Sequence, residues 1–218
     1  YRLPASDLTE RLSLLDPGGR CTVVVPTGPY DRKGRAIWHR ALLSAPEEAA
    51  AQFHQSVRSL DALLGRLAVD HGADLDRAVV GGFSQGGGLA IALLMAAGLE
   101  HRPGAAFGVC SFPPAFPGFV VDRAAASGRA CFLASAHHDR FAPIESSRAG
   151  AVLLAELGLD LTYVETDSEH VMTDEAATAV GAWLERLDTE PNRRDGHELF
   201  AGVAGRHEFY DGLWEYTK

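Results

Sequence analysis

Cysteine is scarce in this chain, which has three cysteines, Cys21, Cys110 and Cys131, among 218 residues. An odd number of cysteines, each within or beside an apolar run, does not build a disulfide framework. The pattern instead favours buried thiols in a reducing compartment. We therefore expect a cytoplasmic protein.

Long apolar runs and basic clusters are also missing. No apolar stretch approaches the length of about 20 residues that a helix needs to cross a bilayer. The formal net charge is -9 at pH 7, and no basic cluster is longer than Arg193-Arg194. These absences argue against a membrane span and against a nucleic-acid partner.

The composition fits one domain, because a chain of 218 residues with 46% hydrophobic and 22% charged residues can bury one sizeable core. Apolar stretches rich in valine and alanine alternate with helical patterns. The apolar stretches show no polar alternation, which predicts an α/β fold with a mostly parallel central sheet and helices on both faces. The expected strands are 20–25, 78–83, 105–111, 130–135 and 160–165, and the expected helices are 6–15, 47–70, 85–98, 145–158 and 172–187.

The most informative motif is Gly82-Phe83-Ser84-Gln85-Gly86, which stands between a predicted strand and a predicted helix. A serine in this position lies on a strained turn, where side chains at the flanking glycines would collide with the strand or the helix. The turn raises the serine hydroxyl above the sheet and directs N–H groups at the helix start toward negative charge beside it. The motif predicts a nucleophile elbow with the Gln85 N–H as an oxyanion donor. The alternative is a glycine-rich turn that binds phosphate without chemistry.

Two further residues follow predicted strands in the order that a serine hydrolase of α/β type requires. Asp139 comes after the strand at 130–135, and His170 comes after the strand at 160–165. The carboxyl ends of the strands of an open α/β sheet line one edge, so Ser84, Asp139 and His170 can converge. The alternatives are a charged surface turn for Asp139 and an exposed loop histidine for His170.

From about Leu8 to Leu187 the chain resembles the carboxylesterase and phospholipase family of small α/β-hydrolases, which includes acyl-protein thioesterases and lysophospholipases. The resemblance implies an α/β-hydrolase fold and a triad in which His170 takes the proton of Ser84 while Asp139 holds the imidazole tautomer. It also implies cleavage of esters or thioesters through an acyl-serine. The matching motifs are Gly81–Gly87, Asp139-x-x-x-Pro143, His170, and Val24–Pro29 followed by Trp38.

The chain departs from the family pattern in two places. Family members carry an upstream strand ending in His-Gly, and the next residue donates a second oxyanion N–H; here Tyr1 falls close to that position. We therefore expect a fragment or processed form without the strand that would lie between 20–25 and 78–83, and a signal peptide before Tyr1 is left open. At the acid, the family's Gly-x-x-Asp is replaced by Ala136-x-x-Asp139. If the second donor is absent, the alternative is a catalytically impaired hydrolase-fold binding protein.

Two apolar loops at the catalytic edge are the expected walls of the substrate pocket. One carries Phe112, Phe116 and Phe119, and the other runs from Gly28 to Trp38. Packing of each loop on the domain's own core is the alternative. Because no long insertion separates the predicted strands, we expect no cap domain and an open cleft for short to medium acyl chains.

No cofactor and no metal is expected, and the expected partner is a small-molecule ester or thioester, with a homodimer left open. A metal-dependent hydrolase is the alternative, but no spacing matches a helical His-x-x-x-His pair and the serine motif would have no role. Its ligands would come from His137, His138, Asp139, Asp167 and His170.

The resemblance ends at Leu187, which predicts a hydrolase domain at 1–187 and a C-terminal extension at 188–218. The extension begins with a polar linker and ends in an aromatic-rich tail. Such a tail docks on its own domain, on a partner subunit or in the gap of the absent strand, or it stays solvated.

Overall fold

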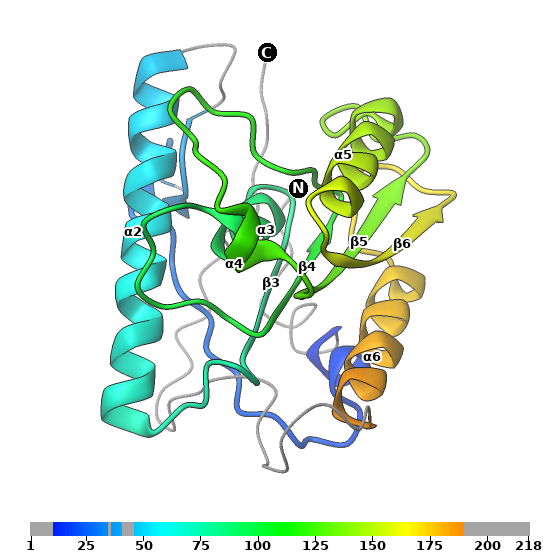
Figure 1. The fold of residues 1–218 in the computed structure, drawn as a ribbon. Coiled ribbons are helices and arrows are strands. Elements are labelled where there is room, and N and C mark those ends of the chain that lie inside the picture. The colour runs from blue at the N-terminus through cyan, green and yellow to red at the C-terminus, as the bar shows by residue number, and fades with distance from the viewer. Residues whose placement is uncertain (1–10, 35, 41–45, 190–218) are drawn as a thin grey trace.

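The computed structural model describes residues 11–34, 36–40 and 46–189, and it shows a parallel sheet enclosed by helices (Figure 1). Residues 11–15 are helical, and a small hairpin precedes the first long helix. The strands are β1 (Tyr30–Asp31), β2 (Ala36–Ile37), β3 (Val79–Phe83), β4 (Ala105–Val109), β5 (Ala130–Ala136) and β6 (Asp160–Thr166). The helices are α2 (Pro46–His71), α3 (Gln85–Met95), α4 (Arg123–Ala126), α5 (Ile144–Glu156) and α6 (Asp174–Thr189).

The main sheet has four parallel strands in the order β3-β4-β5-β6. Each strand pairs with the next one along the chain, so Val79, Ala105, Ala130 and Asp160 lie in register. Every residue of β4 and β5 is buried, as expected for strands covered on both faces. The predicted parallel α/β architecture is confirmed, and the carboxyl ends of all four strands point to one edge.

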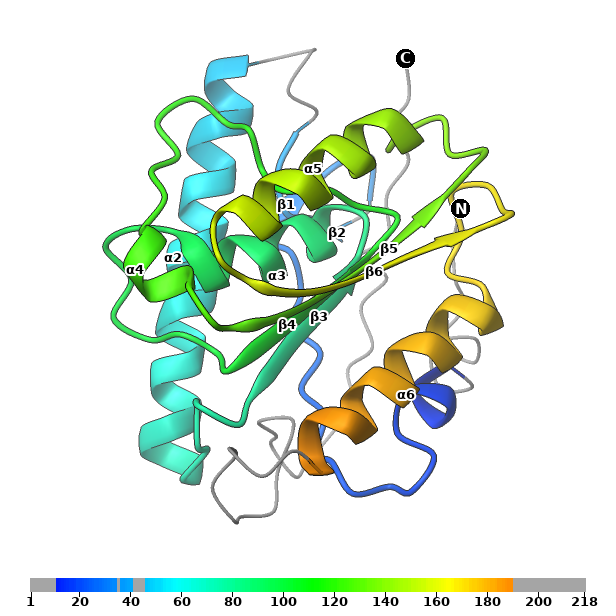
Figure 2. The ribbon, with the colours of Figure 1, turned by 45° about the vertical axis from the view of Figure 1, so that its right-hand side comes forward.

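Helices cover both faces of this sheet. On one face, Ile91 of α3 and Leu154 of α5 pack with Leu133 of β5. On the other face, α6 packs on the sheet, and the ring centroids of Trp183 and Phe132 are 5.6 Å apart. Figure 2 shows α6 on the side of the sheet opposite to α3 and α5. The two-sided burial explains why the strand sequences lack polar alternation.

The longest helix, α2, packs on α3 rather than on the sheet. Phe53, Val57, Leu60 and Leu64 recur at intervals of three and four residues and are buried. They share a cluster with Leu89 of α3. The apolar stripe that the sequence predicts is therefore a helix–helix contact, and it holds the start of α3 in place.

The prediction of a strand at 20–25 is wrong. These residues have no regular secondary structure, and none of them is fully buried. A strand forms only where a neighbour can pair with its N–H and C=O groups. Among the described residues, β3 has no strand partner on its outer edge. The apolar run is therefore present without the hydrogen-bonding neighbour that would make it a strand.

Other differences concern boundaries. The structure adds α4 and the β1–β2 hairpin, which the sequence did not predict, and α3 ends at Met95 rather than at 98. α6 continues to Thr189, two residues past the expected domain boundary at Leu187. Residues 1–10 and 190–218 lie outside the described residues, so the division into a domain and an extension stays a prediction. None of the described helices has both the length and the apolarity to cross a membrane.

Candidate active site

Ser84 joins β3 to α3 in a strained backbone conformation. Its φ of 56° lies in the left-handed region that residues with a Cβ rarely adopt. The Ser84 N–H donates to the carbonyl of Val109 at 2.8 Å, and its own carbonyl accepts from the Gly88 N–H at 3.0 Å. The first bond extends the pairing of β3 with β4 and the second begins α3. The strained residue is therefore held from both sides.

The two glycines of the elbow motif differ in their packing. A Cβ at Gly82 would lie 2.5 Å from the carbonyl carbon of Gly86, so no side chain fits there. A Cβ at Gly86 would meet no heavy atom within 4 Å among the described residues. The steric reason that predicts both glycines from the sequence therefore holds for Gly82 and not for Gly86.

Ser84 directly precedes the first N–H groups of α3. Ser84 is the N-cap residue, yet its side chain makes no capping hydrogen bond. The first N–H groups of a helix have no partner within the helix and attract negative charge. The N–H of Gln85, the first residue of α3, can therefore meet charge that develops next to Ser84.

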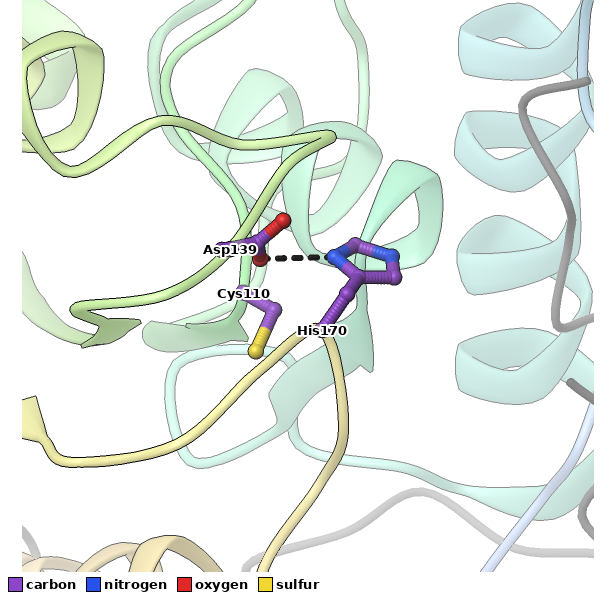
Figure 3. A group of neighbouring side chains, drawn as sticks. All are labelled: Cys110, Asp139 and His170. Carbon is purple, nitrogen blue, oxygen red and sulfur yellow. Dashed lines mark hydrogen bonds and ion pairs between the residues drawn. The ribbon is translucent and has the colours of Figure 1, made fainter.

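Asp139 and His170 form a buried hydrogen-bonded pair, joined by a dashed line in Figure 3. Asp139 Oδ2 lies 2.6 Å from His170 Nδ1. The second carboxylate oxygen, Oδ1, accepts from the N–H groups of Phe141 at 2.7 Å and Ala142 at 2.8 Å. The Asp139 side chain has no exposed surface, and that of His170 is 9% exposed. These bonds fix the carboxylate and turn the Nε2 side of the imidazole away from it.

The structure brings His170 to the edge of the sheet that carries Ser84. The ring centroids of His170 and Phe83 are 4.7 Å apart, so the imidazole lies against the residue that precedes Ser84. His170 Nε2 is buried and has no hydrogen-bond partner among the described residues. The bond between Ser84 Oγ and Nε2 is thus not formed in this conformation. Hydrogen bonds of catalytic groups are often long before substrate binds, and they tighten in the complex.

Cys110 lies beside this pair, although the sequence did not single it out as a site residue (Figure 3). It follows β4 as Ser84 follows β3, and its φ of 50° is also left-handed. Its Sγ lies 3.5 Å from the carbonyl oxygen of Val171. Burial, together with the charge of Asp139, raises the pKa of the Cys110 thiol to about 12. The group is therefore a protonated thiol that donates to the loop carrying His170.

Two histidines tie the loop of Asp139 to the loop of His170. His137 Nε2 lies 2.8 Å from Glu165 Oε2, and His138 Nε2 lies 2.8 Å from Asp167 Oδ1. The backbone N–H groups of both histidines donate to carbonyls in the 166–168 segment at 3.0 and 2.9 Å. The two loops that follow β5 and β6 therefore continue the pairing of those strands beyond the sheet.

The five residues considered as metal ligands bond in separate pairs: His137 bonds to Glu165, His138 to Asp167, and Asp139 to His170. Among the described residues, the group with spacing suited to a metal comprises Cys110, Asp139 and His170, whose ligand atoms lie within 4.8 Å of one another. In that group the carboxylate and Nδ1 bond to each other and the thiol is protonated. This donor chemistry favours an acid–base pair over a metal centre.

The predicted pocket residues lie mostly against the core. Trp38 is buried among side chains of α2 and α3, and Phe116 stacks on Phe53 with ring centroids 4.2 Å apart. Phe119 packs edge-on to Phe53, with centroids 5.7 Å apart. Phe112 is half-buried and lies two residues after Cys110. Among the four predicted pocket residues, Phe112 therefore lies nearest in sequence to the end of a sheet strand, and Tyr1 lies outside the described residues.

His39 is a buried histidine that the sequence does not distinguish from an exposed one. It is 4% exposed, and its ring centroid lies 4.8 Å from that of Phe116 and 5.9 Å from that of Phe53. Burial lowers the pKa of His39 to about 4. Its Nδ1 lies 2.8 Å from the carbonyl oxygen of Arg40, which fits a neutral ring that donates its Nδ1–H.

No protein-family model matches the chain, and no curated protein matches its sequence. Solved structures do match it. A carboxylesterase from Bacillus cereus is 20% identical with a TM-score of 0.70, and the match covers 83% of this chain and 82% of that chain. A carboxylesterase from Mesorhizobium loti is 19% identical with a TM-score of 0.68, covering 83% and 82%. YahD, solved with malic acid, is 17% identical with a TM-score of 0.65, covering 82% and 85%. The chain therefore has the α/β-hydrolase fold that the sequence predicts.

The elbow glycines give opposite predictions for alanine substitution. Gly82→Ala forces a Cβ into the backbone of Gly86 and should lower the free energy of unfolding by about 1–3 kcal/mol. Gly86→Ala meets open space in the first turn of α3 and should leave it unchanged or raise it by up to about 1 kcal/mol. Urea unfolding of both variants checks this. Equal destabilisation by the two substitutions contradicts the packing described for the elbow.

The lowered pKa of His39 predicts that the folded chain loses stability in mild acid. Its pKa is about 4 in the folded chain and about 6.5 when unfolded, so the unfolded chain binds more protons between these values. The contribution of the neutral ring is complete above pH 6.5 and is lost as the pH falls toward 4. Between pH 7 and pH 4.5, the wild type should lose roughly 2 kcal/mol more unfolding free energy than His39→Gln. Parallel losses in urea unfolding of the two proteins would show that His39 does not carry the effect.

Proposed function

We propose that this protein is a serine hydrolase that cleaves carboxylic esters or thioesters through an acyl-serine intermediate. One observation carries the proposal: a buried carboxylate–imidazole pair with an unpartnered Nε2 lies at the same sheet edge as a serine on a strained elbow. An imidazole held in this way activates a neighbouring hydroxyl as a nucleophile. The carboxylesterases that share the fold support the same reaction class.

The roles of the three residues follow from their chemistry. In the proposed reaction, Ser84 Oγ attacks the ester carbonyl while His170 Nε2 accepts the hydroxyl proton. The bond to the leaving group then breaks as Nε2 returns that proton to the departing oxygen or sulfur. Asp139 holds the proton on Nδ1 and stabilises the imidazolium. Water then attacks the acyl-serine with the same base, which releases the acid and restores Ser84.

The negative charge on the carbonyl oxygen needs donors, and the Gln85 N–H is the one we propose from the described residues. Tyr1, which the family resemblance puts near a second donor, lies outside them. Loss of one oxyanion donor lowers kcat by about 100- to 1,000-fold. A hydrolase-fold protein that binds esters without cleaving them is the second candidate. It applies if no second N–H joins that of Gln85 at the carbonyl oxygen.

For the substrate, we propose an ester or thioester of a short to medium acyl chain. The half-buried Phe112 would contact the acyl group, with Phe116, Phe119 and Trp38 behind it as the packed part of the wall. Within the described residues no inserted domain covers the strand ends, which supports an open cleft. All three cysteines are free thiols, which supports the proposed cytoplasmic setting.

Removal of the nucleophile or the base should abolish hydrolysis without unfolding the chain. Ser84→Ala and His170→Ala should each lower kcat for p-nitrophenyl butyrate by at least about 10,000-fold, because the pair acts as a unit. A fluorophosphonate probe should label the wild type and should not label Ser84→Ala. The matched controls are Ser146→Ala on α5 and His71→Ala at the end of α2, both exposed, which should behave as wild type.

Two results would contradict the triad. Turnover near the wild-type rate in Ser84→Ala or His170→Ala would remove that residue from the reaction. A wild type that binds butyrate esters but neither cleaves them nor reacts with the probe would favour the binding protein.

The substitution Asp139→Asn tests the acid of the proposed triad separately from the nucleophile and the base. The amide cannot hold the same imidazole tautomer, so kcat should fall by about 10,000-fold with the fold intact. Asp167→Asn is the control, since that exposed carboxylate bonds to His138 and not to His170. Activity of Asp139→Asn within tenfold of the wild type would move the acid role to another carboxylate, such as Glu145 or Asp167.

A further inference from the structure

The side chain of Gln85 forms hydrogen bonds with a segment that is distant in the sequence. Its Oε1 accepts from the N–H groups of Trp38 and His39, each at 3.3 Å, and its Nε2 donates to the carbonyl of His39 at 3.0 Å. Gln85 is 8% exposed. The residue that follows the proposed nucleophile is therefore bonded through its side chain to residues 38 and 39.

The same segment is held from its other side by α2. Ser56 Oγ donates to the carbonyl of Trp38 at 2.6 Å, and Gln52 Oε1 accepts from the Arg40 N–H at 2.8 Å. Ser56 has no exposed surface. Among the described residues, segment 38–40 makes no backbone–backbone hydrogen bond. Its backbone groups are therefore bonded by three side chains from outside the segment, those of Gln85, Ser56 and Gln52.

We propose that Gln85 is a positioning residue that locks segment 38–40 against the nucleophile elbow and thereby sets selectivity for the length of the acyl chain. This inference rests on the proposed serine hydrolase function and deepens it. Because Ser84 and Gln85 are consecutive, the proposed role puts the segment that Gln85 holds beside an acyl group on Ser84. A fixed wall discriminates between acyl groups by contact, whereas a loose one does not.

The side chains of Trp38 and His39 are buried and pack among apolar residues. The His39 ring packs edge-on against Phe116, with centroids 4.8 Å apart, and against Phe53. Burial keeps that ring uncharged at neutral pH. Because Gln85 and Ser56 occupy the N–H and C=O groups of residues 38 and 39, hydrocarbon can lie beside the segment without leaving them unpaired.

The test loosens the segment independently from its two sides. Gln85→Met removes all three bonds at nearly constant volume, and Gln85→Glu keeps an acceptor for the two N–H groups while it loses the donor to His39. Ser56→Ala removes the bond to Trp38 from α2 and touches neither the elbow nor the triad. The matched controls on the exposed face of α2 are Gln55→Met and Ser59→Ala. For each, kcat/KM is measured with p-nitrophenyl acetate and p-nitrophenyl butyrate.

The ratio of kcat/KM for butyrate over acetate should fall by about tenfold in Gln85→Met and by at least about threefold in Ser56→Ala. Gln85→Glu should recover part of the ratio. In the double variant Gln85→Met, Ser56→Ala, the ratio should fall by less than the product of the two single fold-changes, because both substitutions act on one segment. The two controls should keep the wild-type ratio. A purely structural defect lowers the amount of active protein and leaves this ratio unchanged, so the ratio separates positioning from stability.

The outcomes distinguish this inference from the proposed function. If the wild type hydrolyses both esters and reacts with the fluorophosphonate probe while Gln85→Met and Ser56→Ala keep its ratio, the positioning role is overturned and the serine hydrolase stands. The role is also overturned if Ser56→Ala keeps the ratio while Gln85→Met changes it, since the effect then does not act through segment 38–40. A wild type that neither hydrolyses nor reacts overturns the proposed function and the selectivity role together.

Discussion

A residue with a Cβ held at a φ of 56° is the constraint on which the rest of the site depends. Such a conformation costs of order 1–3 kcal/mol and persists only when its surroundings enforce it. Here the bond from Ser84 to Val109 anchors it to β4, and the buried start of α3 anchors it from the other side. The strain turns the chain from strand to helix within one residue. The residue that carries the hydroxyl is therefore followed directly by Gln85, the first residue of α3.

The second requirement is that an acid and a base reach the same edge, and the pairing of β5 with β6 supplies it. These strands pair along their whole length, from Ala130 with Asp160 to Ala136 with Thr166. The loops beyond them stay paired through the backbone of His137 and His138. Asp139 and His170 are thus brought together by the register of the sheet, and the 2.6 Å bond between them needs little further ordering. Rigid scaffolds of this kind position catalytic groups better than free loops do.

Much of this arrangement was predictable from local sequence. Buried parallel strands, the glycine before the elbow and the strand-by-strand order of Ser84, Asp139 and His170 each leave a local pattern, and the pairing of Asp139 with His170 follows from the geometry of a parallel sheet. Ala136, which stands where the family has glycine, ends β5 without a positive φ. The turn after it closes with a hydrogen bond from the Asp139 N–H to the Ala136 carbonyl at 3.3 Å. A glycine is therefore not required there.

The features that escaped prediction depend on contacts between distant residues. The apolar run at 20–25 has strand composition, but a strand needs a partner, which composition does not reveal. Gln85 bonds to Trp38 and His39, which precede it in the sequence by 47 and 46 positions. Cys110 lies close to His170 only because the strands that precede them belong to one sheet. Burial of His39 follows from the packing of α2 and the 116–119 loop, and no periodic pattern marks it.

A crystal structure of the protein after reaction with a fluorophosphonate would show directly whether Ser84 is the nucleophile and His170 its base. We expect phosphorus bonded to Ser84 Oγ and a phosphonyl oxygen accepting a hydrogen bond from the Gln85 N–H. His170 Nε2 should be turned toward the adduct while Nδ1 stays bonded to Asp139. A probe bonded to any other residue, or an adduct on Ser84 from which His170 stays remote, would contradict the account.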